Sequence, residues 1–158
     1  AIEFQLRRSY QFEFDVDESG HPNYVISAGS AIGGIQNVAA LHALSDATIN
    51  AAVKIENTLF GLIESDYSNK LYTREEFNSL SEMKGSFSQL LSRKLSNAIP
   101  LATFVKDHGQ HYEVQLRIAY SRQEMINEVQ NVFREMMRNE NKALRQKMER
   151  ITGIDKVL

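Results

Sequence analysis

The chain has 158 residues, the usual size of one domain, which is long enough to bury a hydrophobic core. Hydrophobic residues make up 42% and charged residues 24%, both near globular averages, so extensive disorder is excluded. The net charge of −2 gives no general attraction to nucleic acid, and the lack of cysteine excludes disulfides, thiolate metal sites and thiol catalysis.

The N-terminal part of the chain has the pattern of a β-hairpin. Residues Ser9–Asp17 alternate between apolar and polar, with aromatic side chains at every second position from Tyr10 to Phe14. A period of two predicts a half-buried strand. Residues 18–23 contain Gly, Pro and Asn and predict a turn, and residues Asn23–Ala28 predict the second strand.

A glycine-rich segment and a long alanine-rich helix come next. We expect residues 29–34 to form a turn that uses the positive φ open to glycine. The helix is predicted from Gln36 to about Ser65. Small side chains on it allow another element to approach its backbone closely. They are Ala39, Ala40, Ala43, Ala47, Ala51 and Ala52.

A second helix and a second hairpin follow. Residues Thr73–Glu76 form a capping box, which predicts a helix to about Ser96. Strands are predicted at Leu101–Lys106 and His111–Tyr120, joined by a four-residue loop. One face of the last strand is polar, so we expect solvent on that face.

The third predicted helix begins at the capping box Ser121–Glu124 and extends to about Thr152. Its apolar positions are dense in the first half and sparse in the second. We therefore expect residues 139–158 to project from the domain or to dock on a partner, with a second copy of the chain as one candidate. The helix has a basic side that we assign as a weak candidate interaction site. Its residues are Arg138, Lys142 and Arg145.

The element order is strand, strand, helix, helix, strand, strand, helix. This order predicts a single α+β domain over residues 1–158, with one mainly antiparallel sheet of about four strands covered by three helices. The two hairpins each have a polar face, which favours helices mainly on one side of the sheet.

The glycine segment is also the one candidate ligand site. A phosphate-binding loop is excluded, because Ile35 and Gln36 stand where such a loop needs Lys and then Ser or Thr. Backbone amides at a helix N-terminus can still bind an anion. An anion or small-ligand site is therefore kept as the alternative function, with the residues Gly29, Ser30, Gly33 and Gly34.

No motif specifies a reaction, and we predict no catalytic residue, no cofactor and no metal site. His108 and His111 have a spacing that metal ligands use, and His42 and Asp46 lie one helical turn apart. Zinc needs three or four converging ligands, and the sequence does not connect these two pairs. An enzyme, such as a hydrolase with an unrecognised site, stays a low-ranked alternative.

Several segments together resemble a known family. They are Tyr24–Ala31, the alanine-rich helix, Leu91–Pro100 and His111–Tyr120. This pattern, over roughly residues 23–125, is similar to the LPP-type small bacterial outer-membrane lipoproteins, to the first domain of the flagellar assembly protein FlgT, and to exported proteins of the Bacteroidota within that group. The resemblance implies an exported α+β domain of the periplasm or outer membrane, without catalytic residues.

The expected function is therefore a non-enzymatic envelope domain with a structural or assembly role. Its expected partners are another protein or a second copy of the chain, and not nucleic acid. The chain has no run of eighteen apolar residues, so we expect no segment to span a membrane. The resemblance implies membrane attachment only through a lipid anchor, and this sequence has no cysteine to carry one. The chain begins at Ala1, so we expect a processed product whose leader and lipid-bearing cysteine lie outside this sequence.

Overall fold

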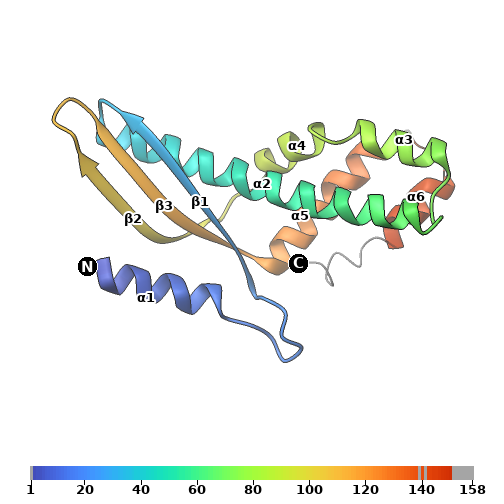
Figure 1. Cartoon of the computed structure of the whole chain (residues 1–158), viewed down its shortest axis with the longest axis horizontal. Helices are drawn as coiled ribbons and strands as arrows, with labels where there is room; N and C mark the ends of the chain where they lie inside the picture. The colour runs from blue at the N-terminus through green and yellow to red at the C-terminus, as the bar shows by residue number, and fades with distance from the viewer. Residues whose placement is uncertain (1, 139, 141, 151–158) are drawn as a thin grey trace.

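The computed structural model describes residues 2–138, 140 and 142–150. Over these residues the fold is α+β, with a three-stranded antiparallel sheet and six helices (Figure 1). The elements, in chain order, are α1 (Ile2–Glu13), β1 (Tyr24–Gly33), α2 (Gln36–Ser68), α3 (Arg74–Glu82), α4 (Ser86–Lys94), β2 (Ile99–Asp107), β3 (Tyr112–Ser121), α5 (Arg122–Met136) and α6 (Lys142–Arg150).

The sheet has the strand order β1-β3-β2, so β3 is central and β1 and β2 are both edges. Tyr24 pairs with Ser121 at one end of β1, and Gly33 pairs with Tyr112 at the other. A β-bulge between Pro100 and Ala102 interrupts the pairing of β2 with β3. The alternation predicted for β3 is confirmed, because Val114, Leu116 and Ile118 are all buried.

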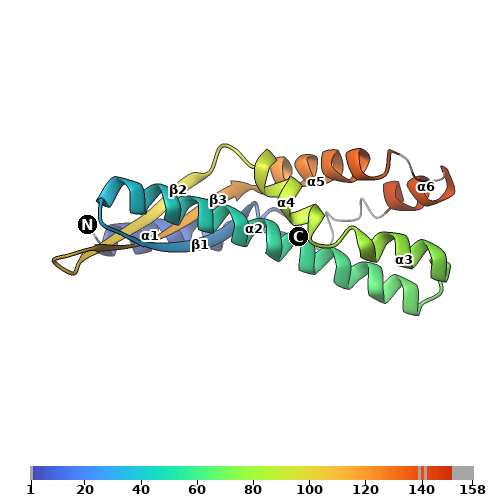
Figure 2. The same ribbon diagram turned by 90° about the horizontal axis from the view of Figure 1, so that it is seen from above.

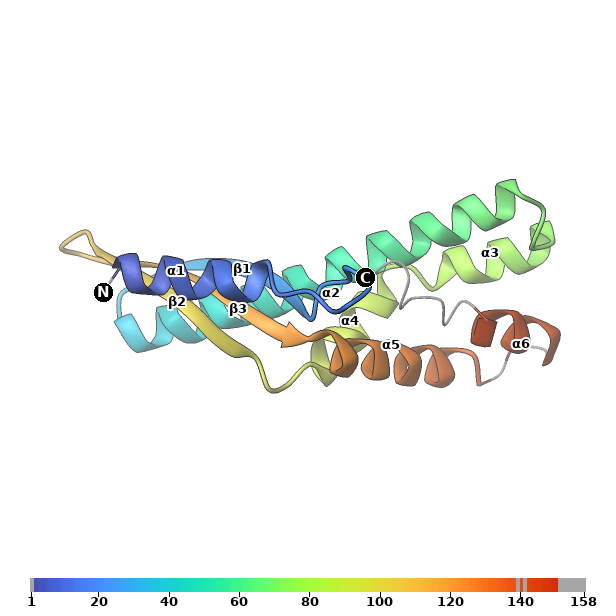
Figure 3. The same cartoon turned by 90° about the horizontal axis from the view of Figure 1, so that it is seen from below.

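Helix α2 is the longest element and extends through the whole molecule. Its N-terminal half lies on one face of the sheet, and its C-terminal half packs against α3 and α4 at the opposite end, where α5 and α6 also lie (Figures 1 and 2). Helix α1 lies on the other face of the sheet, as the view from below shows (Figure 3). The sheet is therefore covered on both faces, and the expectation of helices mainly on one side is wrong.

The predicted N-terminal hairpin is wrong. Residues 2–13 form helix α1, and Val16 makes only an isolated bridge to Pro22. The sequence contains a helical spacing as well as the strand-like one, since Ile2, Leu6 and Tyr10 recur every four residues. In the short run from Tyr10 to Phe14 the two patterns overlap, and the sheet consequently has three strands instead of four.

The face of β3 predicted to be wet is partly covered by α1. The side chain of Arg117 on that face is 3.3 Å from the carboxylate of Glu13. At the other end of α1, Gln5 accepts a hydrogen bond from the backbone amide of Thr103 in β2. These polar contacts attach α1 to the sheet while most of its large apolar side chains remain exposed.

The predicted glycine turn is also wrong. Strand β1 continues through Gly29 to Gly33, and the glycines with positive φ are Gly20, Gly85 and Gly109 among the described residues. The predicted close packing is present, but it occurs at Gly29. A Cβ there would lie 2.3 Å from the carbonyl oxygen of Ala43 and 2.3 Å from the amide nitrogen of Ala47. The alanine positions predicted for α2 thus form the contact with β1.

The second predicted helix is divided into α3 and α4 at Gly85, whose φ is +90°. Its first part begins with the predicted capping box, because Thr73 and Glu76 exchange hydrogen bonds. The start of α4 is capped by another helix: the carboxylate of Glu56 in α2 accepts bonds of 2.8 Å from the amides of Gly85 and Ser88. The sequence analysis missed this contact because Glu56 lies 29 residues before Gly85.

The third predicted helix is interrupted after Met136 and resumes as α6. In α6, Leu144 is only 1% exposed, and the ammonium group of Lys147 lies 2.7 Å from the carboxylate of Glu76. The segment 142–147 therefore lies against the helical end of the domain. Residues 151–158, where the rest of the predicted projection falls, are outside the described residues.

We predict that Gly29→Ala destabilises the fold by about 3 kcal/mol, the upper range for overpacking, because the atoms that the new methyl group meets belong to the backbone of α2. Gly34→Ala is the matched control, since a Cβ at Gly34 meets nothing within 4 Å. Urea unfolding of both variants measures the difference. Equal midpoints for the two variants would show that the β1–α2 contact does not need a glycine.

A second prediction concerns Glu76. Burial raises the pKa of this carboxyl, but the hydrogen bonds from Lys147 and Thr73 outweigh burial, and the net pKa lies below its usual value. A lowered folded-state pKa contributes stability above the unfolded value of about 4.3, and this contribution is lost as the pH falls through the folded-state pKa. We expect Glu76→Gln to lower the free energy of unfolding at pH 7 by about 1–2 kcal/mol.

The same variant is expected to flatten the loss of stability that occurs as the pH falls below the unfolded-state pKa of about 4.3. Glu75→Gln, at the exposed neighbouring position, is the control and should keep the wild-type profile. Chemical unfolding at several pH values gives the measurement. Parallel pH profiles for the wild type and Glu76→Gln would contradict this role of the carboxylate.

Candidate interaction surface

The four residues of the predicted ligand site do not converge at the start of α2. Gly29 is packed on α2, and the amide of Ser30 donates a 3.0 Å hydrogen bond to the carboxylate of Asp46. Gly33 lies against Ala39, while Gly34 is open. A carboxylate bound to one of the candidate amides disfavours an anion at the same place.

The contact of Asp46 with Ser30 belongs to a pattern that covers the sheet edges. The side-chain amide of Asn50, one turn after Asp46, donates to the carbonyl of Ala28 at 2.9 Å. The outward-facing backbone groups in the middle of edge strand β1 are thus occupied by α2. On the opposite edge, Gln5 occupies the amide of Thr103 at 2.7 Å. Side chains covering an exposed edge oppose the addition of a further strand.

The two candidate metal-ligand pairs, His108 with His111 and His42 with Asp46, make separate contacts. The ring of His108 lies 4.7 Å from the ring of His111 and is hydrogen-bonded to Glu113 at 3.0 Å. This bond from His108 holds the pKa of the Glu113 carboxyl below its usual value. Asp46 is used at the edge of β1, as described above. Within the described parts of the chain, no group of three or more His, Asp or Glu side chains is arranged to hold a metal ion.

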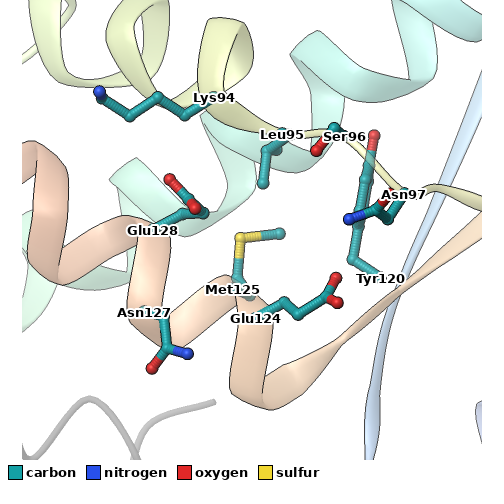
Figure 4. A pocket seen from close by; sticks show the side chains of 9 residues that line it. All are labelled: Lys94, Leu95, Ser96, Asn97, Tyr120, Glu124, Met125, Asn127 and Glu128. Atoms are coloured by element: carbon teal, nitrogen blue, oxygen red, sulfur yellow. The ribbon is translucent and has the colours of Figure 1, made fainter.

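A polar cavity of about 160 Å³ lies where α4, the segment leading to β2, and the first turns of α5 meet (Figure 4). Met125 lies in the middle of its lining, with Glu128 toward Lys94 and Glu124 toward Asn97. The lining also contains Leu95, Ser96, Tyr120 and Asn127.

The groups around this cavity already have structural partners. Tyr120 is buried, and its hydroxyl lies 2.8 Å from the hydroxyl of Thr48 in α2. Burial raises the pKa of Tyr120, so the phenol stays protonated at neutral pH. Lys94 pairs with Glu135 at 3.2 Å. The lining contains no histidine, and its two carboxylates lie one turn apart on a single helix, so it offers no nucleophile activated by a base.

A larger groove lies between α2 and the edge strand β2. Neighbouring strands are about 4.8 Å apart and a helix is about 10 Å wide, so one helix covers two strands of a sheet. Helix α2 covers β1 and β3 and leaves the face of β2 open on its side. The resulting groove has a volume of about 460 Å³. Its lining comprises Asn37, Ala40, Leu41, Leu44, Ala98, Pro100, Thr103, Leu116, Arg117 and Ile118.

The surface around this groove is almost free of charge. Residues 24–53, which form β1 and the N-terminal half of α2, contain a single formally charged side chain, Asp46. Large apolar side chains are nevertheless exposed on these elements. They are Ile32, Ile35, Val38, Leu41, Leu44, Ile49 and Val53. Exposed aliphatic side chains without charges around them are typical of the core of a protein–protein interface.

The basic residues that were predicted as a weak interaction site do not line the groove. Arg138, Lys142 and Arg145 are exposed near and on α6, at the helical end of the molecule, away from the groove (Figure 1). The groove was not predicted from the sequence, because it is formed by segments far apart in the chain. The lack of charge over residues 24–53 is visible in the sequence and is the one local signal of this surface.

Comparisons of the chain with protein-family models, with curated proteins and with solved structures found no match. The geometry of the groove and the sheet edges therefore carries the functional argument.

A third prediction concerns the edge of β1. The double variant Asp46→Ala, Asn50→Ala leaves the amide of Ser30 and the carbonyl of Ala28 without protein partners. We expect the free energy of unfolding to fall by about 2 kcal/mol, at about 1 kcal/mol per hydrogen bond. We also expect thioflavin-positive aggregates to form faster under agitation, because the edge of β1 is exposed. The control is Asn57→Ala, Ser65→Ala, at two exposed positions in the C-terminal half of the same helix. Equal aggregation of the two double variants would contradict the protective role of Asp46 and Asn50.

Proposed function

We propose that this chain is a non-enzymatic assembly domain whose groove between α2 and β2 binds an aliphatic helix of a protein partner. The observation that carries the proposal is the open apolar groove beside the N-terminal half of α2, which has a single charged side chain up to residue 53. Exposed patches of this kind on a folded domain mark contact sites.

The shape and chemistry of the groove favour a protein over a small ligand. Small-ligand sites enclose most of their ligand and use a few convergent polar groups to orient it. Here the walls are Leu41 and Leu44 on one side and Pro100 on the other, and Leu116 and Ile118 also line the groove. An amphipathic helix that places aliphatic side chains every three or four residues fits such a groove.

The sheet edges support the same choice of partner structure. A partner that added a strand would need the free backbone groups of β1 or β2. Asp46 and Asn50 occupy those of β1 near Ser30, and Gln5 occupies the amide of Thr103 in β2. A helix that enters the groove does not compete for these groups, so helix docking is the favoured mode.

We also propose that the chain has no enzymatic activity. The polar cavity beside Tyr120 is lined by carboxylates, amides and one paired lysine, without a histidine to act as a base near neutral pH. Tyr120 bonds to Thr48 and Lys94 pairs with Glu135, so both side chains have a structural role.

The proposed compartment is the bacterial periplasm or the outer membrane, with any membrane attachment through a lipid anchor carried by residues outside this chain. The resemblance of Tyr24–Ala31 and His111–Tyr120 to the exported lipoprotein and FlgT-like domains supports this proposal. None of the described helices is long and apolar enough to cross a bilayer. Cell fractionation of the full-length gene product tests the compartment, and recovery in the cytosol would contradict it.

A fourth prediction tests the groove as a protein-contact site. A photoreactive amino acid replaces Leu41 at the wall of the groove, and in a second variant it replaces Leu71. Both side chains are large, apolar and exposed, at 65% and 57%, but Leu71 lies in the segment between α2 and α3. Irradiation of cells that produce the protein should give a discrete protein adduct at position 41 and none at position 71. Failure to form an adduct at position 41 would contradict the proposal.

A further inference from the structure

We infer that the helix that fills the groove is α2 of a second copy of this chain. This inference rests on the proposed function and names its partner. In the resulting two-fold dimer, the outer side of α2 in each copy enters the groove of the other copy. Such an isologous contact uses the same surface twice, so this surface must carry both a ridge and a groove.

Helix α2 carries the ridge next to the groove. Val38, Leu41, Ser45 and Ile49 are exposed and follow one another at intervals of three, four and four residues, which places them on one side of the helix. This side faces away from Ala39, Ala43 and Ala47, which contact the sheet. Leu41 belongs to both features, because it also forms a wall of the groove.

The spacing of this ridge is suited to another helix. Side chains at intervals of three or four residues lie along one side of a helix and form the seam where it packs on a second helix. The small side chain of Ser45 lies in the middle of the seam, where it lets the two backbones approach. An antiparallel pair in which Val38 meets Ile49 of the other copy places both ends of the ridge on aliphatic partners.

Electrostatics favour a second copy over a charged partner. Two copies of a surface that carries net charge of one sign repel each other, so a self-contact is favoured on a surface with little net charge. Arg117 is the one charged residue among those that line the groove, and its side chain is paired with Glu13 of α1 on the other face of the sheet. The carboxylate of Asp46 accepts a hydrogen bond from the amide of Ser30 at the edge of β1. A self-contact through the ridge and groove therefore brings aliphatic side chains together, whereas a strongly charged partner would find no complement.

The size of the surface sets the expected strength. Ten residues line the groove, and the ridge adds Val38, Ser45 and Ile49. A standard interface uses about 20–30 residues on each side, and smaller contacts are usually transient. We therefore expect a dissociation constant in the micromolar range, on the order of 10 μM.

Analytical sedimentation of the 158-residue chain tests the inference. The protein concentration is varied between about 1 and 300 μM, which spans a micromolar equilibrium. The wild type should shift from 18.0 kDa to twice that mass as its concentration rises. Leu41→Glu should weaken dimerisation at least about 100-fold, because each copy would bury a carboxylate in an apolar groove. Leu71→Glu, at an exposed apolar position outside the groove, should dimerise like the wild type. Circular dichroism checks that both variants fold, which we expect because both side chains are more than half exposed.

The lack of native cysteine allows a test of orientation. A mixture of the single variants His42→Cys and Ser45→Cys should form disulfide-linked mixed dimers on oxidation, because these positions face each other in the antiparallel register. A parallel pair would instead link Ser45→Cys to itself, and this result would overturn the antiparallel arrangement.

The outcomes separate this inference from the proposed function. A wild type that stays monomeric at 300 μM overturns the dimer, and so does equal weakening by Leu41→Glu and Leu71→Glu. If the photoreactive group at position 41 then gives an adduct whose mass differs from twice 18.0 kDa, the groove binds a different protein and the proposed function survives. If it gives no adduct at all, both proposals fail.

Discussion

The contact between the backbone of β1 at Gly29 and the backbone of α2 at Ala43 and Ala47 determines how the rest of the fold is arranged. A Cβ on Gly29 would overlap main-chain atoms of the helix, so the strand and helix can approach this closely only through glycine. The hydroxyl of Ser27 strengthens the same seam by donating a 2.7 Å bond to the carbonyl of Ala47. The close approach at Gly29 and the bond from Ser27 to Ala47 therefore fix the position of α2 on the sheet.

The groove follows from that position. With α2 seated on β1 and β3, a helix of ordinary width leaves the face of β2 uncovered. At the opposite end, the C-terminal half of α2 buries Ile55, Leu59 and Ile63 among the other helices, and Glu56 caps α4. The single helix thus has two kinds of surroundings: a closed helical core at one end and, at the other, a sheet whose strand β2 is covered by none of the described helices on the side of α2.

Local signals in the sequence predicted a large part of this fold, and the long-range contacts were beyond them. The sequence predicted the helix caps at Thr73 and Ser121 because each cap depends on residues close together in the chain. It predicted the alternation in β3 and the alanine-lined face of α2 because each is one periodic pattern. Helix α1 was mistaken for a strand because both periods fit Tyr10 to Phe14. The Glu56 cap, the Lys147–Glu76 pair and the groove join segments far apart in sequence, and a single sequence carries no signal for such contacts.

Amide hydrogen exchange at low and high protein concentration shows whether α2 and the groove form the interface between two copies, because it reports on each segment of the unmodified chain. If they do, protection in residues 36–49 and 98–105 rises with concentration, while protection in α3 and at the cavity beside α5 stays unchanged. Protection that is independent of concentration throughout the chain, or that rises at α5 and not at α2, would show that this surface is not the interface.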